Sequence, residues 1–325
     1  MSFMKSGAIL GSLLLAASAL SISPAQAQDY PSRSIRLVVP YSPGGANDTV
    51  ARILAQKLTD SLGQNVVVDN RPGASGMIAG EFVSKAPPDG YTIMVDLSSI
   101  TLNPALYPNI TYDVRTDLSP IMRAVNVLHI FLVNSALPVR NMKELIAYAK
   151  ANPGKLNYCS PGTGGPQHVD VEQLKRLTGI DVVHVPYKGG APALQAIVAN
   201  DVQFGFFAVS TSLPQIRAGK LRPIAVSGDK RLDLFPDVPT FAEQGFSGIT
   251  TPWLGVFAPG KTPAPIIKRL QAELAKALTS PDVREKLAVQ GLEASPSTTA
   301  EFVKQVNDEI ATYGKVIRES GIKVE

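Results

Sequence analysis

Short apolar runs alternate with amphipathic stretches along most of this chain. Residues 35–39 form a β-branched apolar run, typical of a strand buried on both faces. Turn-forming residues follow at 41–45, and apolar residues then recur with helical spacing over 50–62, with Asn47 or Asp48 as candidate N-cap. A strand, a glycine corner and a helix in this order direct free backbone N–H groups above the end of the strand. Because the helix start adds about half a positive charge, this corner is suited to an anion.

The same alternation continues to the end of the chain and predicts an α/β protein with mainly parallel sheets. We expect strands at 65–68, 91–95, 125–133, 156–158, 181–185, 202–207, 223–226 and 253–257, and helices at 77–85, 142–150, 167–177, 192–199, 263–278, 281–290 and 298–320. Every α/β protein contains ordinary strand-to-helix turns, so the first corner alone does not establish a binding site.

The first corner has a counterpart later in the chain. VPYSPGGA at 39–46 is similar to VPYKGGA at 185–191, and a third glycine corner at 160–165 also joins a strand to a helix. We interpret this recurrence as two similar α/β lobes, with the apolar segment at 125–133 and another at 249–257 crossing between them. The alternative is a chance similarity of two turns. Ligands of open α/β sheets bind outside the carboxyl ends of the strands, so facing lobes would place these corners around one cleft.

The N-terminal 27 residues are typical of a secretory signal peptide. Lys5 precedes a stretch of small and apolar residues, and Ala25-Gln26-Ala27 has the pattern of a cleavage site, so we expect cleavage after Ala27 and export. The only cysteine is Cys159, which excludes an intramolecular disulfide. Its neighbours indicate a buried apolar position rather than a nucleophile.

Charge and motifs argue against several other functions. The chain has 31 Lys and Arg against 27 Asp and Glu and no basic run, so nucleic-acid binding has little support. GVFAPGKT at 255–262 matches the phosphate-loop pattern, but 256–257 should be strand and Pro263 follows at once. Ser160 and His168 are close in sequence, yet no G-x-S-x-G elbow is present. The three histidines lack the spacing of metal ligands, and we expect neither metal nor cofactor.

Nine segments of the chain carry a resemblance to one known family. They are YPSRSIRLVVPYSPGGANDTVARILAQKL, VVVDNRPGASGMIAG, APPDGYT, NPALY, SPGTGG, VPYKGGAPALQ, IRAGKLRPIAVS, FPDVPTFAEQG and WLGVFAPGKTP. In this combination the chain resembles the solute-binding receptors of tripartite tricarboxylate transporters, the Bug-type periplasmic receptors. The resemblance spans essentially the whole chain after residue 27.

The resemblance implies a two-lobe fold of the type II periplasmic-binding-protein kind, with a ligand cleft between the lobes. Residues 28–130 and 250–325 would form one discontinuous lobe, and 131–249 the other. In such receptors a small carboxylate is held largely by backbone amides and ordered waters. The resemblance further implies a periplasmic, monomeric, non-enzymatic protein that works with the membrane subunits of a tripartite transporter.

Carried over position by position, the resemblance places ligand-binding residues on two walls. One wall comprises Tyr41, Ser42, Gly44, Gly45, Asp48, Ala74, Ser75, Ser98 and Ser99, and the other Ser160, Gly162, Thr163, Gly164, His168, Tyr187 and Ala191. Phe204 is a further candidate, because alternate side chains of its strand point to the same face of the sheet and one face could line the cleft. Packing in the core is the alternative. Gln203 stands where the family usually has an acid, which argues against an amino-acid ligand.

We therefore expect a mono- or dicarboxylate ligand without an ammonium group, and an aromatic acid is an option if Phe204 or Phe206 faces the cleft. A tricarboxylate would bring about three charges into a cleft with few cations, which is costly. Two other functions stay open from the sequence: an exported enzyme acting on a small carboxylate or ester, and a ligand-sensing receptor for a signalling partner.

Overall fold

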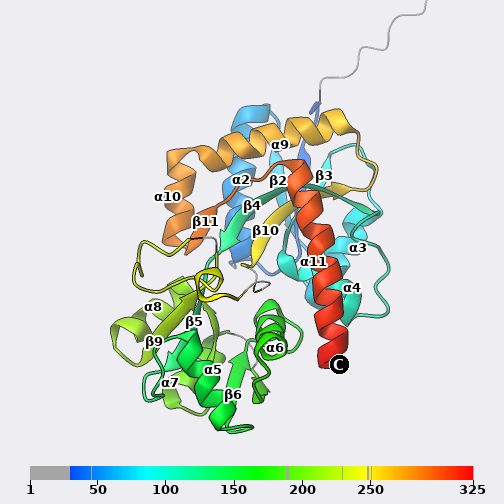
Figure 1. Ribbon diagram of the computed structural model, residues 1–325. Coiled ribbons are helices and arrows are strands. Elements are labelled where there is room, and N and C mark those ends of the chain that lie inside the picture. The colour runs from blue at the N-terminus through cyan, green and yellow to red at the C-terminus, as the bar shows by residue number, and fades with distance from the viewer. Residues whose placement is uncertain are drawn as a thin grey trace, which may run out of the picture. The chain divides into compact units, whose positions relative to one another are not determined.

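The fold contains two β-sheets, and most of their strands coincide with apolar runs in the sequence. The strands are β1 Ile35–Val39, β2 Val66–Asn70, β3 Thr92–Leu97, β4 Leu118–Val127, β5 His129–Asn134, β6 Leu156–Ser160, β7 Val182–Pro186, β8 Phe204–Ala208, β9 Leu221–Val226, β10 Trp253–Pro259 and β11 Leu292–Ala294. The first sheet has the order β11-β4-β10-β3-β1-β2, and the second β7-β6-β8-β5-β9. Figure 1 shows strands of both sheets with the helices around them.

This description rests on a computed structural model, which describes residues 30–44, 46–187, 190–228, 230–246, 249 and 251–324. The expected signal peptide and its cleavage site lie outside the described residues. The chain divides into one unit ending at Ser32 and another spanning Arg33–Glu325, and everything below concerns the second. Within the described part of the chain, no helix is both long and apolar enough to span a membrane.

Helices cover both faces of each sheet. The helices are α2 Ala46–Leu62, α3 Met77–Ser84, α4 Asn103–Leu106, α5 Met142–Ala151, α6 Pro166–Thr178, α7 Gly190–Ala199, α8 Val209–Arg217, α9 Ala264–Thr279, α10 Pro281–Val289 and α11 Thr299–Ser320, with short 3-10 turns η2 Ala74–Gly76, η3 Ser98–Thr101 and η4 Ala242–Gln244. Val38, Met94 and Phe257 project from the first sheet toward α3 and α11. Helices α2 and α9 pack against each other and against strands β1 and β4.

Most strands within each sheet run in the same direction. In the first sheet β1 is parallel to β2 and β3, whereas β10 is antiparallel to β3 and β4, and β11 is antiparallel to β4. In the second sheet β6 is parallel to β7 and β8, and β5 is antiparallel to β8 and β9. Read from its other edge, the first sheet has the order β2-β1-β3-β10-β4-β11, in which the antiparallel strand β10 holds the fourth place, as β5 does in the second sheet. The two sheets therefore share one topology.

The chain crosses from the first sheet to the second at Leu128. Strand β4 ends at Val127 and β5 begins at His129, so the single strand expected at 125–133 is in fact two strands in two sheets. The Val127 N–H donates to the Pro252 carbonyl at 2.7 Å, which joins this crossing to the segment leading back into β10. The chain thus leaves the first sheet at Leu128 and returns to it between Val226 and Trp253, and the expectation of one continuous strand at 125–133 is wrong.

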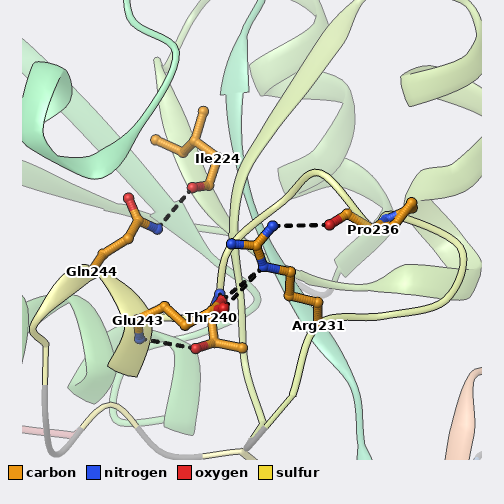
Figure 2. A network of polar contacts seen from close by, with 6 residues as sticks. All are labelled: Ile224, Arg231, Pro236, Thr240, Glu243 and Gln244. Atoms are coloured by element: carbon orange, nitrogen blue, oxygen red, sulfur yellow. Dashed lines mark hydrogen bonds and ion pairs between the residues drawn. The ribbon is translucent and has the colours of Figure 1, made fainter.

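A polar network fixes the long return segment between β9 and β10 (Figure 2). Both carboxylate oxygens of Glu243 lie 3.0 Å from Arg231 Nε, and Arg231 also donates to the Pro236 carbonyl at 3.1 Å. Thr240 and Glu243 exchange side-chain and backbone hydrogen bonds at 2.7 and 3.0 Å. Gln244 donates to the carbonyl of Ile224 in β9 at 3.1 Å, so η4 is anchored to the second sheet.

Candidate functional site

Asp48 organises the corner between β1 and α2. Its carboxylate is buried, and Oδ2 accepts hydrogen bonds from the Gly44 N–H at 3.0 Å and from Arg52 Nε at 2.9 Å. Its Oδ1 accepts from Asn70 Nδ2 at 3.0 Å. The hydrogen bond from Arg52, with those from Gly44 and Asn70, lowers the pKa of Asp48 to about 2. The carboxylate is thus occupied in holding its own loop, and Gly45 lies outside the described residues.

Hydroxyl groups join this corner to the end of β3. Tyr41 OH and Ser99 Oγ are 3.0 Å apart and share a hydrogen bond, and burial raises the pKa of Tyr41 above its usual value, so its hydroxyl stays neutral. Ser98 is buried, whereas Ser42 and Gly44 are exposed to solvent. The corner therefore offers neutral hydroxyl groups, and Gly44, whose own N–H is bonded to Asp48, places no side chain over the loop.

The loop between β2 and α3 has an unusual left-handed conformation. Four consecutive residues have positive φ: Gly73 (133°), Ala74 (46°), Ser75 (52°) and Gly76 (89°). Ser75 Oγ lies 2.8 Å from Tyr107 OH, at the end of α4. The predicted site residues Ala74 and Ser75 therefore lie on a tightly constrained turn at the carboxyl end of β2.

On the second sheet, Ser160 closes the corner between β6 and α6. Its Oγ lies 2.7 Å from the Gly162 carbonyl and 2.8 Å from His184 Nε2. A hydroxyl has one proton and a carbonyl can only accept, so Ser160 donates to Gly162 and His184 Nε2 carries the proton that it donates to Ser160. A serine nucleophile would need the opposite arrangement, with the histidine accepting. This geometry fits a role for Ser160 in loop structure.

His168 is held in one tautomer by the same corner. Its Nδ1 accepts a hydrogen bond from the Gly164 N–H at 3.0 Å, so its ring proton resides on Nε2. The rings of His168 and His184 stack with their centroids 3.7 Å apart. Burial, and then the neighbouring His184, lowers the pKa of His168 to about 3, and burial lowers the pKa of His184 to about 4. Both rings are neutral near pH 7 and add no positive charge to the site.

The short helix α4 contacts both candidate walls. Tyr107, directly after α4, bonds Ser75 of the first wall, and the neighbouring Leu106 packs against Gly164 of the second. Gly164 has a φ of +79°, and a Cβ there would lie 2.7 Å from a Val324 methyl group and 3.1 Å from one of Leu106, so a larger residue would strain the backbone and displace these side chains. An apolar cluster continues this contact: Leu102, Leu106, Val169, Tyr313, Val316 and Ile317.

Two further predicted site residues lie at the β7–α7 corner. The Tyr187 N–H donates to the Ser160 carbonyl at 3.0 Å, and its partly buried ring packs on the apolar core beside α7. Ala191 is exposed in the first turn of α7, and residues 188–189 between them are outside the described part of the chain. The corner following β6 and the corner following β7 are therefore adjacent.

Phe204 lies in the hydrophobic core of the second sheet. It is 0 % exposed, and its ring lies 5.4 Å from that of Phe131 and 5.9 Å from that of Tyr158. Phe206 projects into the same core and Phe207 into the opposite one, as the alternation of the strand predicted. In this structure Phe204 therefore has the core-packing role that was the alternative to lining the cleft.

Sequence reasoning missed four residues that hold the candidate loops. Asn70 bonds Asp48, Asn103 and Tyr107 bond Ser75, and His184 bonds Ser160. Each pair is separated by at least 22 positions in the chain, so local pattern carries no sign of it. Asn103 and Tyr107 do fall within the NPALY segment, which the family resemblance includes without assigning it a role.

The sequence profile of the tripartite tricarboxylate transporter family receptor matches residues 50–322. The chain belongs to this receptor family. BugT of Bordetella pertussis is 37% identical to this receptor over 309 residues, covering 93% of the present chain and 94% of BugT.

Solved structures of similar proteins support the same fold. A Rhodopseudomonas palustris protein with adipate is 36% identical to this receptor, with a TM-score of 0.74, covering 91% of this chain and 99% of that one. MatC of the same organism, with bound malate, is 31% identical, with a TM-score of 0.70, covering 89% and 100%. The α/β, two-lobe periplasmic-binding-protein fold expected from the sequence is thereby confirmed for this receptor.

Proposed function

We propose that this receptor captures a small mono- or dicarboxylate in the periplasm and delivers it to the membrane subunits of a tripartite tricarboxylate-type transporter. The observation that carries the proposal is the grouping of glycine corners and neutral hydroxyls at the carboxyl ends of the parallel strands. The lobes are those expected above, 28–130 with 250–325 and 131–249, except that the first boundary moves to Leu128, because β5 from His129 belongs to the second sheet, and the ligand lies between them. The receptor acts as a monomer and catalyses no reaction.

Neutral backbone donors account for the proposed ligand class. Several N–H groups directed at one carboxylate form strong hydrogen bonds without a countercharge, whereas three carboxylates would need cations. Two cations near the first corner are already paired, Arg52 with Asp48 at 2.9 Å and Arg71 with Asp69 at 2.8 Å. Two similar receptors hold the dicarboxylates adipate and malate, which fits this class.

A thermal-shift and calorimetric screen of mono-, di-, tri- and aromatic carboxylates tests the ligand class. A ligand at about 100 times its Kd should add about 2.7 kcal/mol to the free energy of unfolding. We expect a mono- or dicarboxylate to bind most tightly and to be recovered unchanged after incubation. Tightest binding of citrate or aspartate would refute the proposed class, and conversion to a product would refute a purely binding role.

A pair of glycine variants tests where the anion binds. Gly44 and Gly63 both have positive φ, 91° and 68°, and a Cβ added at either would meet no atom within 4 Å. Gly44→Val and Gly63→Val should therefore strain the backbone similarly, by about 1–2 kcal/mol. Only Gly44→Val changes the proposed anion corner, so it alone should abolish binding. Undiminished affinity in Gly44→Val would refute this placement of the ligand.

A further inference from the structure

The left-handed turn at Gly73–Gly76 contains two adjacent residues that are not glycine. Ala74 and Ser75 have φ values of 46° and 52°, a region that L-residues with a Cβ rarely adopt. Other non-glycine residues of this kind in the described part of the chain, Asn200 and Lys261, are isolated. Two consecutive strained residues need neighbouring contacts that hold them in place.

Those contacts come from α4 and the residue that follows it. Asn103 Nδ2 donates to the Ser75 carbonyl at 3.1 Å, and Tyr107 OH lies 2.8 Å from Ser75 Oγ. Asn103 is 2 % exposed, so its amide is fixed by burial. One strained residue is thus held through both its backbone and its side chain by a single short element.

The hydrogen bonds within the turn leave two backbone donors unused. The Gly76 N–H donates to the Gly73 carbonyl at 3.0 Å, and the Met77 N–H donates to the Ala74 carbonyl. The N–H groups of Ala74 and Ser75 have no hydrogen-bond acceptor among the described residues. Successive backbone N–H groups in a left-handed turn form a concave site for anions.

We infer that Asn103 and Tyr107 are positioning residues for ligand binding. They hold the turn in the left-handed conformation in which the N–H groups of Ala74 and Ser75 face the ligand carboxylate. The inference rests on the proposed function, because it assigns these donors to the ligand of that site. Asn103 and Tyr107 would then contribute to ligand affinity although neither is among the residues predicted to contact the ligand.

Helix α4 connects the left-handed turn at Gly73–Gly76 to the second wall as well. Leu106 packs against Gly164, while the next residue, Tyr107, bonds Ser75. A displacement of α4 would therefore disturb both corners together. We expect Tyr107→Phe, which keeps the ring and removes the hydroxyl, to weaken binding without moving the helix.

The test measures adipate and malate binding by calorimetry in matched variants. Tyr107→Phe should weaken binding by about tenfold. Ser75→Gly should restore the affinity of Tyr107→Phe to within about twofold of the wild type, because glycine adopts positive φ without support. Tyr148→Phe, a partly buried tyrosine on α5, is the control and should leave affinity unchanged.

The outcomes distinguish a role of Tyr107 in positioning the turn from a general role in protein stability. Rescue by Ser75→Gly supports positioning, because a purely structural loss at Tyr107 would not be repaired at Ser75. Wild-type affinity in Tyr107→Phe, or weakened affinity that Ser75→Gly leaves unrepaired, would overturn the inference while the proposed function stands. A wild-type protein that binds no carboxylate in the wider screen would overturn both.

Discussion

Replacing Asp48 with asparagine should destabilise the protein by about 2 kcal/mol at pH 7. Asp48 accepts three hydrogen bonds, from Gly44, Arg52 and Asn70, whereas an asparagine side chain has one acceptor oxygen. If that oxygen takes the Oδ2 position, the buried NH₂ group at position 48 faces the Asn70 amide without an acceptor, at a cost of about 1–3 kcal/mol, while Asn70 Nδ2 keeps its hydrogen bond to the Tyr41 carbonyl. The ion pair with Arg52, whose side chain is 56% exposed, adds less than about 1 kcal/mol.

The pH dependence provides an independent check on this magnitude. The pKa of Asp48 falls from 3.8 to about 2 on folding, chiefly through the Arg52 hydrogen bond. At about 1.36 kcal/mol per pKa unit, and discounted for the exposure of Arg52, this gives about 1–2 kcal/mol. Because the folded pKa is depressed, the stabilisation is complete above pH 3.8 and is lost as the pH falls toward 2.

Urea unfolding of the wild type and Asp48→Asn between pH 7 and pH 3 measures both effects. The difference in unfolding free energy should be constant from pH 7 to about pH 5 and should narrow below about pH 4. Asp60→Asn, in the exposed last turn of the same helix, is the control and should change stability by less than about 0.5 kcal/mol. A difference that does not narrow at low pH, or an Arg52→Ala variant that loses as much stability, would refute the reasoning.

Two further predictions concern buried groups. Burial raises the pKa of the Cys159 thiol to about 12, so a thiol reagent at pH 8 should label it only in denaturant, and rapid labelling of the folded protein would contradict its position. Burial also raises the pKa of Glu309, whose Oε1 accepts a hydrogen bond from Trp253 Nε1 at 2.8 Å, and a glutamine at this position would keep that acceptor without a charge to bury. Glu309→Gln should therefore gain stability relative to the wild type as the pH rises from 5 to 8, measured by thermal unfolding; a relative loss would contradict this assignment.

The sequence predicted correctly the strands and helices whose pattern of apolar residues depends only on which of their own faces is buried. Strand β1 and helix α2 were expected almost as they occur, because their spacing of apolar residues directly reports burial. Strand β4 begins at Leu118, seven residues before the expected start, since Pro120 and Arg123 interrupt its apolar pattern. Its pairing with β10 contains register shifts, which only the partner strand explains.

The candidate site likewise has a part that could be predicted from local sequence and a part that could not. The glycine corners could be predicted because Pro and Gly have local conformational effects, whereas the groups that hold them come from distant segments. Tyr107 lies 32 positions from Ser75, and His184 lies 24 from Ser160. Such pairs depend on the packing of α4 and on the register of β6 with β7, which no single stretch of sequence encodes.

The recurrence of VPYSPGGA and VPYKGGA has a different origin from the one the sequence suggested. The first follows β1, the second strand of the order β2-β1-β3-β10-β4, and the second follows β7, the outer strand of the matching order β7-β6-β8-β5-β9. The corner equivalent to 41–45 is therefore 160–165, which shares Ser-Pro-Gly with it, at 42–44 and 160–162, and differs in the residues that follow. Proline at a strand end and glycines in a turn recur because corners require them. Under the proposed function the two ends of a dicarboxylate would meet loops that share Ser-Pro-Gly but differ in the residues after it, and that difference would let the receptor bind an asymmetric ligand in one orientation.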